Sequence, residues 1–382
     1  MTALDVVIMA AGKGTRMKSS MPKVLHPLAG KPLVQHVIDT AHALHTRHTI
    51  LITGHGAEIV EPLLQKAYPQ KTLQFAKQMP QLGTGHAVQQ ALPLLDDDGV
   101  VVVLSGDVPL TQADTLQALI KACDGKNLAL LTIDFEDPTG YGRIVRGFDH
   151  QVHDIIEHKD ANELQLEIKE IYSGIMAVPA KWLKKWLPQL KNDNAQKEFY
   201  LTDVVRMAVS DHVKVVAHKI TDPAQVAGIN SPLQLAELER IYQTRQAHAL
   251  LAQGVRIIDP ARIDLRGTLT CQEDVLIDIN CIFEGRVQLG VGVHIGAHCV
   301  IANCVIEDGA VILPFTHIDG ELQGITVGKG ARVGPYARLR PGAQLGSDVH
   351  VGNFVEIKNS TLADGAKANH LAYLGEIGRA HV

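Results

Sequence analysis

Hydrophobic residues follow two different rhythms along the chain, and the rhythm changes in the second half of the sequence. In the first 230 residues, short uninterrupted apolar runs alternate with amphipathic stretches such as 33–44. The clearest runs, at 6–9, 49–52 and 100–104, have the length of strands that are covered on both faces. This alternation predicts an α/β domain with a Rossmann-like, mostly parallel sheet, whose ligands bind at the carboxyl edge of the strands.

The second rhythm has a period of six residues. One series comprises Ile277, Phe283, Leu289, Ile295 and Ile301, and another comprises Val327, Val333, Leu339, Leu345, Val351 and Ile357. Glycine often follows the aliphatic residue, as at Gly290 and Gly346. This pattern predicts a left-handed parallel β-helix of hexapeptide repeats, with each aliphatic side chain pointing into a narrow core. The stretch 313–324 breaks the phase, and we expect it to loop out.

A helix is predicted between the two regions. Ser231 is a good N-cap, Pro232 suits the first turn, and Gly254 suits the position just past the end. The sequence therefore divides into a nucleotide-binding type of domain, a linker helix and a β-helix domain, at residues 1–231, 232–253 and 254–382.

Composition narrows the possible partners. The chain has 36 Lys and Arg against 41 Asp and Glu, a net charge of −5, which argues against a nucleic-acid or anionic-membrane surface. An anionic substrate must therefore be held by local cations and backbone amides. No uncharged apolar run approaches the roughly 18 residues of a membrane helix, and the start lacks the features of a signal peptide. We expect a cytoplasmic protein that does not insert into membranes.

Four of the five cysteines fall late in the chain, at Cys271, Cys281, Cys299 and Cys304. Such a cluster could suggest zinc. Because the chain has no C-x-x-C pair, small buried side chains are the favoured interpretation.

The strongest chemical signal is the segment Met-Ala-Ala-Gly-Lys-Gly-Thr-Arg at 9–16, followed by Pro22-Lys23. A strand that ends in small residues and two glycines allows backbone amides to approach a triphosphate. Arg16 offers a planar fork for phosphate oxygens, and Lys23 offers a compact charge. A tight turn with surface cations is the alternative, but the added Arg and Pro-Lys favour a phosphate site. The spacing is not that of a Walker loop.

The sequence resembles sugar-nucleotide pyrophosphorylases and, over nearly its whole length, the bifunctional GlmU family, which makes UDP-N-acetylglucosamine. The shared motifs are AAGKGTRMKSSMPK, QLGTGHA, SGDVPL, DPTGYGRI, EHKDA, FYLTD, RLRPGA, VGNFVEIK and HLAYLG. The resemblance implies uridylyl transfer from UTP to N-acetylglucosamine 1-phosphate, which feeds peptidoglycan and lipopolysaccharide precursor synthesis. It also implies a second domain descended from an acetyl-CoA:glucosamine-1-phosphate N-acetyltransferase, and a homotrimer.

The resemblance also implies site residues in the first domain. Arg16 and Lys23 would be catalytic, and Asp107 with Asn230 would bind Mg²⁺ through the oxygen donors that this cation prefers. The implied nucleotide- and sugar-binding residues are Met9, Ala10, Ala11, Gly12, Gln78, Gly83, Thr84, Ser105, Gly106, Gly142, Glu157, Tyr172 and Asn230. Relatives usually carry Asn at the position of Tyr172, so either the phenol hydroxyl replaces that contact or the backbone takes it over.

Two cations mark a second site. Arg340 and Lys358 stand where glycine usually follows the inward aliphatic residue. A solvated corner is the alternative for each. The resemblance implies that Arg340, Lys358 and Tyr373 bind substrate. It also implies that His370 is the general base, taking a proton from the amine of glucosamine 1-phosphate as that amine attacks acetyl-CoA.

Family members continue for several coils beyond Gly375, and residues 376–382 resemble a translated sequencing adapter. We therefore expect this chain to be a fragment of a longer protein, with an acetyltransferase that is inactive in the truncated form. Two other functions remain open. One is a single-activity nucleotidyltransferase for another sugar 1-phosphate, to which Tyr172 gives some weight. The other is a trimeric, non-catalytic scaffold, against which the intact set of Arg16, Lys23, Asp107 and Asn230 argues.

Overall fold

The structure is a computed structural model that describes residues 3–69 and 73–375. The expectation about residues 376–382 lies outside the described residues. The chain forms two compact units, Met1–Pro27 with Pro32–Ala236, and Leu28–Lys31 with Glu237–Val382. In the described parts of the chain, no helix has the length and apolar character to cross a membrane.

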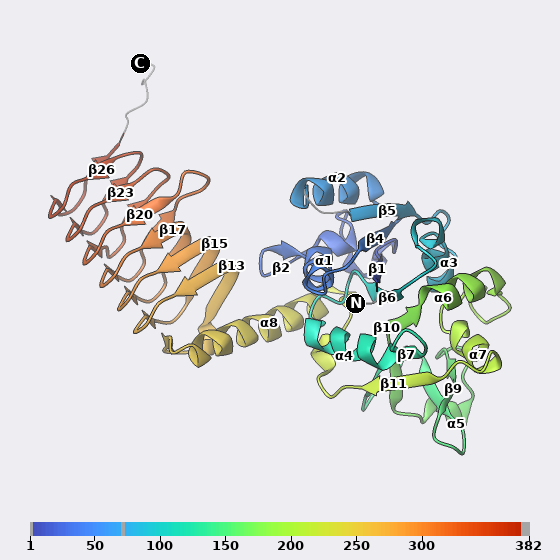
Figure 1. The fold of residues 1–382 in the computed structure, drawn as a ribbon. Coiled ribbons are helices and arrows are strands. Elements are labelled where there is room, and N and C mark those ends of the chain that lie inside the picture. The colour runs from blue at the N-terminus through green and yellow to red at the C-terminus, as the bar shows by residue number, and fades with distance from the viewer. Residues whose placement is uncertain (1–2, 70–72, 376–382) are drawn as a thin grey trace. The chain divides into compact units, whose positions relative to one another are not determined.

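The first unit is built on a mixed sheet with the strand order β11-β7-β10-β6-β1-β4-β5 (Figure 1). These strands are β1 (Leu4–Met9), β4 (His48–Thr53), β5 (Leu73–Lys77), β6 (Val100–Ser105), β7 (Leu128–Asp134), β10 (Glu170–Pro179) and β11 (Val215–Lys219). The pairs β1·β4, β1·β6, β4·β5 and β7·β11 are parallel, whereas β10 is antiparallel to β6 and β7. The antiparallel strands β8 (Arg143–Arg146) and β9 (Val152–Ile156) continue from β10. All three strands that the apolar runs predicted are confirmed.

Helices cover both faces of this sheet, as continuous apolar strands require. Val6 and Ile8 of β1 share one core with α1, α2 and α4, and Val7 shares the opposite core with α3, α6 and α7. The bounds are α1 (Leu33–Ala43), α2 (Ala57–Ala67), α3 (Thr84–Gln89), α4 (Ala113–Cys123), α5 (Glu163–Leu166), α6 (Ala180–Trp186) and α7 (Asp203–Ser210). Short 3₁₀ turns cover Thr15–Met17, Lys23–Leu25, Leu92–Leu94, Leu187–Gln189, Pro223–Gln225 and Pro260–Arg262, and β2 (Pro27–Leu28) pairs with β3 (Lys31–Pro32).

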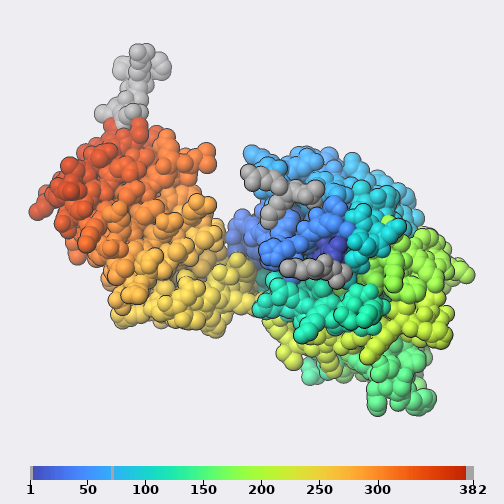
Figure 2. Space-filling view, in the orientation of Figure 1, coloured from blue at the N-terminus to red at the C-terminus, as the bar shows by residue number. Residues whose placement is uncertain are grey.

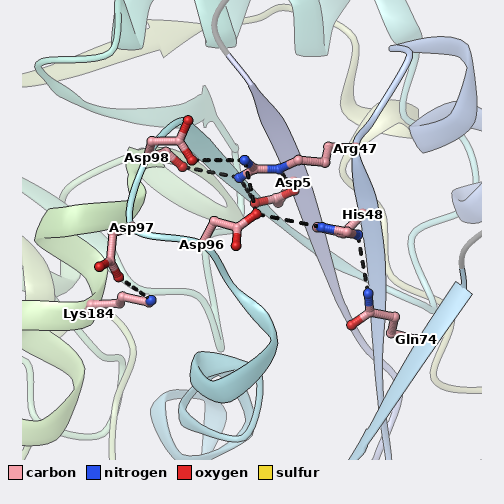
Figure 3. A network of polar contacts seen from close by, with 8 residues as sticks. All are labelled: Asp5, Arg47, His48, Gln74, Asp96, Asp97, Asp98 and Lys184. Carbon is pink, nitrogen blue, oxygen red and sulfur yellow. Dashed lines mark hydrogen bonds and ion pairs between the residues drawn. The ribbon is translucent and has the colours of Figure 1, made fainter.

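A network of polar side chains holds the amino ends of the central strands (Figure 3). Asp5 of β1 is fully buried, and both of its carboxylate oxygens accept hydrogen bonds from Arg47, at 3.0 and 2.6 Å. Arg47 also donates to Asp98, just before β6, at 2.8 Å, and lies 3.0 Å from Asp96. These acceptors raise the pKa of Arg47 further above its usual range. The guanidinium therefore joins the starts of three neighbouring strands.

The linker helix is α8 (Pro232–Ala252), and its ends match the predicted signals. The Ser231 hydroxyl accepts a hydrogen bond from the N–H of Gln234 at 3.3 Å, and Gly254 follows the helix with φ of 93°. These contacts satisfy backbone groups that a helix end would otherwise leave unpaired.

The second unit is a left-handed parallel β-helix whose stacked coils form the surface coloured from yellow to red in Figure 2. One sheet stacks β12 (Arg256–Ile257), β14 (Leu276–Ile277), β16 (His294–Ile295), β18 (Val311–Ile312), β21 (Arg332–Val333), β24 (His350–Val351) and β27 (Lys367–Ala368). The long strands β13 (Ile263–Cys271), β15 (Cys281–Leu289) and β17 (Val300–Ile306) then divide into two rows. One row consists of β19 (His317–Asp319), β22 (Arg338–Leu339), β25 (Glu356–Ile357) and β28 (Tyr373–Leu374). The other row consists of β20 (Ile325–Val327), β23 (Gln344–Leu345) and β26 (Thr361–Leu362).

The hexapeptide interpretation is confirmed, because every residue of the two six-residue series is at most 3% exposed. The expected loop at 313–324 is wrong in its extent. The coil continues through β19, where Ile318 is fully buried, and only the turn around Leu322 leaves it. That turn is closed locally, since Gly324 donates to the carbonyl of Gly320 at 2.8 Å.

The late cysteines are free thiols in this unit. Cys281, Cys299 and Cys304 are buried, and Cys271 is partly buried. Burial raises the pKa of Cys281 to about 11 and that of Cys299 to about 12. The interpretation as small core side chains is confirmed for the three buried thiols.

Aromatic side chains stack along one corner of the β-helix. The rings of His298, Phe315, Tyr336 and Phe354 follow one another with centroid distances of 4.7, 4.9 and 5.4 Å. All four residues have positive φ, between 56° and 62°. They therefore occupy the same left-handed corner position in successive coils.

Candidate functional site

The loop after β1 is held between two neighbouring loops at the carboxyl edge of the sheet. Ala10 donates to the carbonyl of Ile52 at 2.8 Å, and Gly106 donates to the carbonyl of Met9 at 2.9 Å. A Cβ on Gly106 would come within 3.3 Å of the Ala10 Cβ. Because the loops pack this closely, only small residues fit, and the backbone of the segment is presented to the cavity.

Four predicted site residues from distant parts of the first unit meet beside this loop. Lys23 Nζ contacts Asp107 Oδ2 and lies 3.0 Å from Asn230 Oδ1. Arg16 Nη2 lies 2.9 Å from the same Asn230 oxygen. The side chains of Lys23 and Asp107 are 13% and 20% exposed, so water reaches the ion pair only partly.

The backbone fixes this group from both sides. Ile229 donates to the carbonyl of Asp107 at 3.0 Å, and the N–H of Asn230 donates to Gln234 Oε1 at 2.8 Å. Lys23 lies in the short 3₁₀ turn that starts after Pro22. The backbones that carry the Asp107 and Asn230 oxygens are therefore held in place, while the ammonium is carried at the end of a long side chain.

A cavity of about 320 Å³ opens next to these residues. Its walls include ten of the predicted residues, Met9, Ala10, Ala11, Gly12, Lys23, Gln78, Gly83, Thr84, Ser105 and Asp107. Val24, Gln81, Ala87 and Glu198 complete the lining. Arg16, Gly106 and Asn230 adjoin it through the contacts above, whereas Gly142, Glu157 and Tyr172 do not line it.

The amide side chain of Gln78 is buried rather than solvated, with 3% exposure. Its Nε2 donates to the carbonyl of Gly83 at 2.9 Å and lies 3.3 Å from His86 Nδ1. Gly83 has φ of 107°, and a Cβ there would collide with the Phe199 backbone. Gln78 therefore sets the shape of the loop that starts α3, and any contact with a ligand would be additional.

Glu157 and Gly142 lie beside each other, and Glu157 also lines a second cavity. Glu157 lines a cavity of about 590 Å³, and a Cβ on Gly142 would lie 3.7 Å from Glu157 Oε2. The Thr202 hydroxyl donates to Glu157 Oε1 at 3.0 Å. Burial raises the pKa of the Glu157 carboxyl, and neighbouring Asp160 and Asp203 raise it further, against the hydrogen bond from Thr202. A buried carboxylate of this kind is suited to accepting hydrogen bonds from a polyhydroxylated ligand.

Tyr172 is buried beside these residues, at a bulge in β10. Its N–H donates to the carbonyl of Gly142 at 2.9 Å. Its hydroxyl has no hydrogen-bond partner within the described residues. Burial, and secondarily the charge of Glu157, raise the pKa of the phenol well above its usual value. The backbone of Tyr172 thus holds the Gly142 segment, and the hydroxyl is left without a hydrogen-bond partner in a buried place.

In the second unit, Arg340 and Lys358 occupy equivalent positions in consecutive coils. The N–H of Arg340 donates to the Ile357 carbonyl at 2.8 Å, and the N–H of Lys358 donates to the Leu374 carbonyl at 2.9 Å. Arg340 Nη1 also binds Glu356 Oε1 at 2.8 Å. His370 and Tyr373 lie on the next coil, both exposed. The four residues thus belong to three neighbouring coils, with Arg340 and Lys358 partly buried and His370 and Tyr373 exposed.

Three further residues belong to the first site but were missed as site residues. Gln81 donates to the carbonyl of Ala11 at 3.1 Å, Thr202 binds Glu157, and Gln234 binds Asn230. Gln81 and Thr202 fall within the motifs QLGTGHA and FYLTD, which was the available signal. Gln234 lies in the first turn of α8, and neither its residue type nor its position in the sequence indicated a role in the site.

The oxygens of Asp107 and Asn230 fit a hard cation, because both already converge on the Lys23 ammonium. Over residues 3–69 and 73–375, no group of three or more His, Cys, Asp or Glu side chains could hold a metal ion. A divalent cation at this place would therefore take its remaining ligands from phosphates and water, as Mg²⁺ commonly does.

Comparison with known proteins agrees with this architecture. The family described as MobA-like NTP transferase domain matches residues 6–256, and the bacterial transferase hexapeptide family (six repeats) matches residues 324–359. A crystal structure of UDP-glucose pyrophosphorylase complexed with UDP-glucose aligns with 64% of this chain and 99% of its own, with a TM-score of 0.52 and 17% identity. That likeness shows the fold alone.

Curated relatives are much closer in sequence. The bifunctional protein GlmU of Polaromonas naphthalenivorans is 66% identical over 98% of this chain and 80% of its own length. That of Paracidovorax citrulli is 64% identical over 98% and 81%, and that of Nitrosospira multiformis is 52% identical over 99% and 81%.

The fold and these matches define a nucleotidyltransferase-type protein that carries a hexapeptide-repeat β-helix. At this identity and coverage, the chain belongs to the bifunctional GlmU family. It spans about four fifths of the length of the curated relatives it matches, 80–82% in each of those compared.

Proposed function

We propose that this chain transfers a uridylyl group from UTP to N-acetylglucosamine 1-phosphate, forming UDP-N-acetylglucosamine and pyrophosphate. The observation that carries the proposal is the meeting of two cations, Arg16 and Lys23, with two oxygen donors, Asp107 and Asn230, beside a cavity lined by small residues. A triphosphate needs backbone amides and cations close together, and this is the place where the first unit provides both.

The reaction needs no covalent intermediate with the enzyme. A phosphate oxygen of the sugar 1-phosphate attacks the α-phosphorus of UTP in line, and the bond from that phosphorus to the β-phosphate oxygen breaks. Arg16 and Lys23 bind the charge that spreads over the transferring phosphoryl group. Asp107 and Asn230 would hold Mg²⁺, which when bound neutralises phosphate charge. The remaining work of the protein is to position the two substrates.

Two groups of residues would divide substrate recognition. Gln78, Gly83 and Thr84 line the smaller cavity and would form the uracil subsite, in which backbone groups of the loop that Gln78 shapes can pair with the edge of the base. Gly142, Glu157 and Tyr172 would form the sugar subsite. Glu157 can accept hydrogen bonds from sugar hydroxyls, and the backbone of Gly142 is held in place by the N–H of Tyr172.

The second unit descends from an acetyltransferase that acts on glucosamine 1-phosphate with acetyl-CoA, with Arg340, Lys358 and Tyr373 as substrate-binding residues and His370 as the general base. Hexapeptide β-helices commonly assemble as trimers, and we propose a homotrimer. The substrates are cytoplasmic metabolites, so the protein would work in the cytoplasm and supply a precursor of peptidoglycan and lipopolysaccharide.

The test is pyrophosphate release by the purified chain with UTP and Mg²⁺, comparing N-acetylglucosamine 1-phosphate with glucose 1-phosphate. Release selective for the acetylated sugar is expected. Lys23→Gln should lower kcat/KM about 100-fold or more, as the loss of a charge-stabilising donor does in other enzymes. Equal use of both sugars would point to a different sugar 1-phosphate, and no release from folded protein would favour the scaffold.

A further inference from the structure

We propose that Lys23 is a placeholder for the divalent cation. In the substrate-free protein, its ammonium occupies the position between Asp107 and Asn230, so lysine and metal exclude each other until a nucleotide draws the lysine away. The inference rests on the proposed function, because it concerns the same four residues, and it adds an order to their use.

The Lys23 ammonium and the divalent cation would bind the same two oxygen atoms. Lys23 Nζ contacts Asp107 Oδ2 and lies 3.0 Å from Asn230 Oδ1. These are the two protein oxygens that would bind the metal. An ammonium and a divalent cation cannot both contact the same two oxygens, because like charges a few ångströms apart repel strongly where water is largely excluded. Lys23 is 13% exposed and Asp107 is 20% exposed, so screening is incomplete.

The two oxygen donors stand on backbones that are tied together, whereas the two cations end long side chains. Asp107 and Asn230 are joined through the hydrogen bond from Ile229 to the Asp107 carbonyl, at 3.0 Å. The Lys23 stem is gripped near its backbone, since a Cβ on Gly14 would lie 2.6 Å from the Lys23 Cβ. The three outer bonds of the lysine side chain can still rotate, so a change of rotamer can carry its ammonium from Asp107 toward the cavity that Lys23 also lines. Arg16, which donates to the same Asn230 oxygen at 2.9 Å, is exposed and equally able to leave.

A triphosphate at the neighbouring cavity offers both cations stronger acceptors than a carboxylate and an amide. Charge-assisted hydrogen bonds to phosphate then draw Lys23 and Arg16 toward the ligand and release Asp107 and Asn230. The metal is therefore bound weakly without nucleotide and tightly with it. By linkage, the metal must strengthen nucleotide binding by the same factor.

The test measures Mn²⁺ binding to the nucleotide-free full chain by electron paramagnetic resonance of the unbound ion, so no turnover is involved. Lys23→Gln should bind Mn²⁺ about tenfold more tightly than the wild type, because a charge-assisted hydrogen bond no longer competes. Lys23→Met, which keeps the aliphatic stem, should show the same gain. Lys23→Arg keeps a cation and should stay near the wild-type affinity.

Lys13→Gln is the matched control. Lys13 is exposed on the same loop, and its replacement removes the same charge as Lys23→Gln. Among the described residues, no contact joins Lys13 to Asp107 or Asn230. It should change the Mn²⁺ affinity by less than about twofold, as expected for a solvent-screened charge.

Three outcomes decide the inference, and the first separates it from the proposed function. If Lys23→Gln and Lys23→Met fold and bind Mn²⁺ no better than the wild type, the placeholder role is wrong, even if uridylyl transfer is confirmed. If Lys23→Gln gains affinity and adding Asp107→Asn removes the gain, the inference stands. A gain that survives Asp107→Asn places the metal elsewhere, and it would overturn both the inference and the proposed metal ligands.

Discussion

Replacing Arg47 would measure how much of the stability of the first unit depends on the buried ion pair between Arg47 and Asp5. The change is Arg47→Met, which keeps an unbranched aliphatic side chain but removes both hydrogen bonds to Asp5, at 3.0 and 2.6 Å (Figure 3). Asp5 is fully buried at the start of β1, so its carboxylate would be left charged and unpaired. The expected result is a large loss of stability, greater than any surface ion pair would cause.

The magnitude follows from burial on the two sides of the pair. Removing one partner of a buried pair costs about 3–5 kcal/mol, and we take about 3 kcal/mol because Arg47 is 27% exposed and admits some water. For a unit of this size, that corresponds to a fall in melting temperature of about 6–12 °C. Asp98 is 75% exposed, and water screens its pair with Arg47, so Asp98→Asn should change the stability far less and is the matched control.

The assay is urea unfolding of the full chain followed by tryptophan fluorescence. Both tryptophans of the chain, Trp182 and Trp186, lie in α6 of the first unit, so the signal reports that unit without contribution from the β-helix. The double variant Asp5→Val/Arg47→Met should recover most of the loss, because an apolar pair no longer leaves a charge buried.

The reasoning would be refuted if Arg47→Met lay within about 0.5 kcal/mol of the wild type, which is the range of a surface ion pair. It would also be refuted if the double variant were less stable than Arg47→Met. The first result would mean that the pair is no more than a surface contact, and the second that Asp5 has another essential partner.

Three further predictions follow from single residues. Gly14→Ala must place a Cβ 2.6 Å from the Lys23 Cβ at φ of 59°, so the rate of uridylyl transfer should fall about 10- to 100-fold. The control is Gly125→Ala, which is also at positive φ but has no atom within 4 Å of its Cβ. It should lose about 1 kcal/mol of stability and no activity. Burial raises the pKa of Glu157, so the wild type loses stability as pH rises from the unfolded pKa of about 4.5 through the higher folded value. Glu157→Gln does not ionise, so its stability relative to the wild type should grow over that interval in fluorescence-detected unfolding. A constant difference would contradict the pKa shift. Tyr336→Ala breaks two ring stacks, at 4.9 and 5.4 Å, and should lower the stability of the β-helix by about 1–2 kcal/mol in thermal melts followed by circular dichroism, whereas an unchanged transition would show that the stack is only a surface feature.

The elements that the sequence predicted are those whose signal is local. The run 100–104 is apolar throughout because β6 is buried on both faces. The six-residue period arises because each face of a coil turns one side chain inward. The candidate site is different in kind. Lys23 and Asn230 are 207 residues apart, and nothing in either neighbourhood indicates the other. Resemblance supplied their roles, and only the fold shows that the lysine stands between the two proposed metal ligands.

The corners of the β-helix show why a local rule can fail while the global pattern succeeds. A residue with positive φ should be glycine or asparagine, because a Cβ in the left-handed region costs about 1 kcal/mol or more. Phe315, Tyr336 and Phe354 break this rule in three successive coils. Each ring stacks on the next, and such a pair gains about 0.5–1.5 kcal/mol, which offsets part of the strain. The gain exists only after the coils are in register, since the stacked residues are 18 or more positions apart. A sequence rule that examines one turn at a time sees the strain and not its compensation, so it would replace these aromatic residues with glycine and weaken the corner.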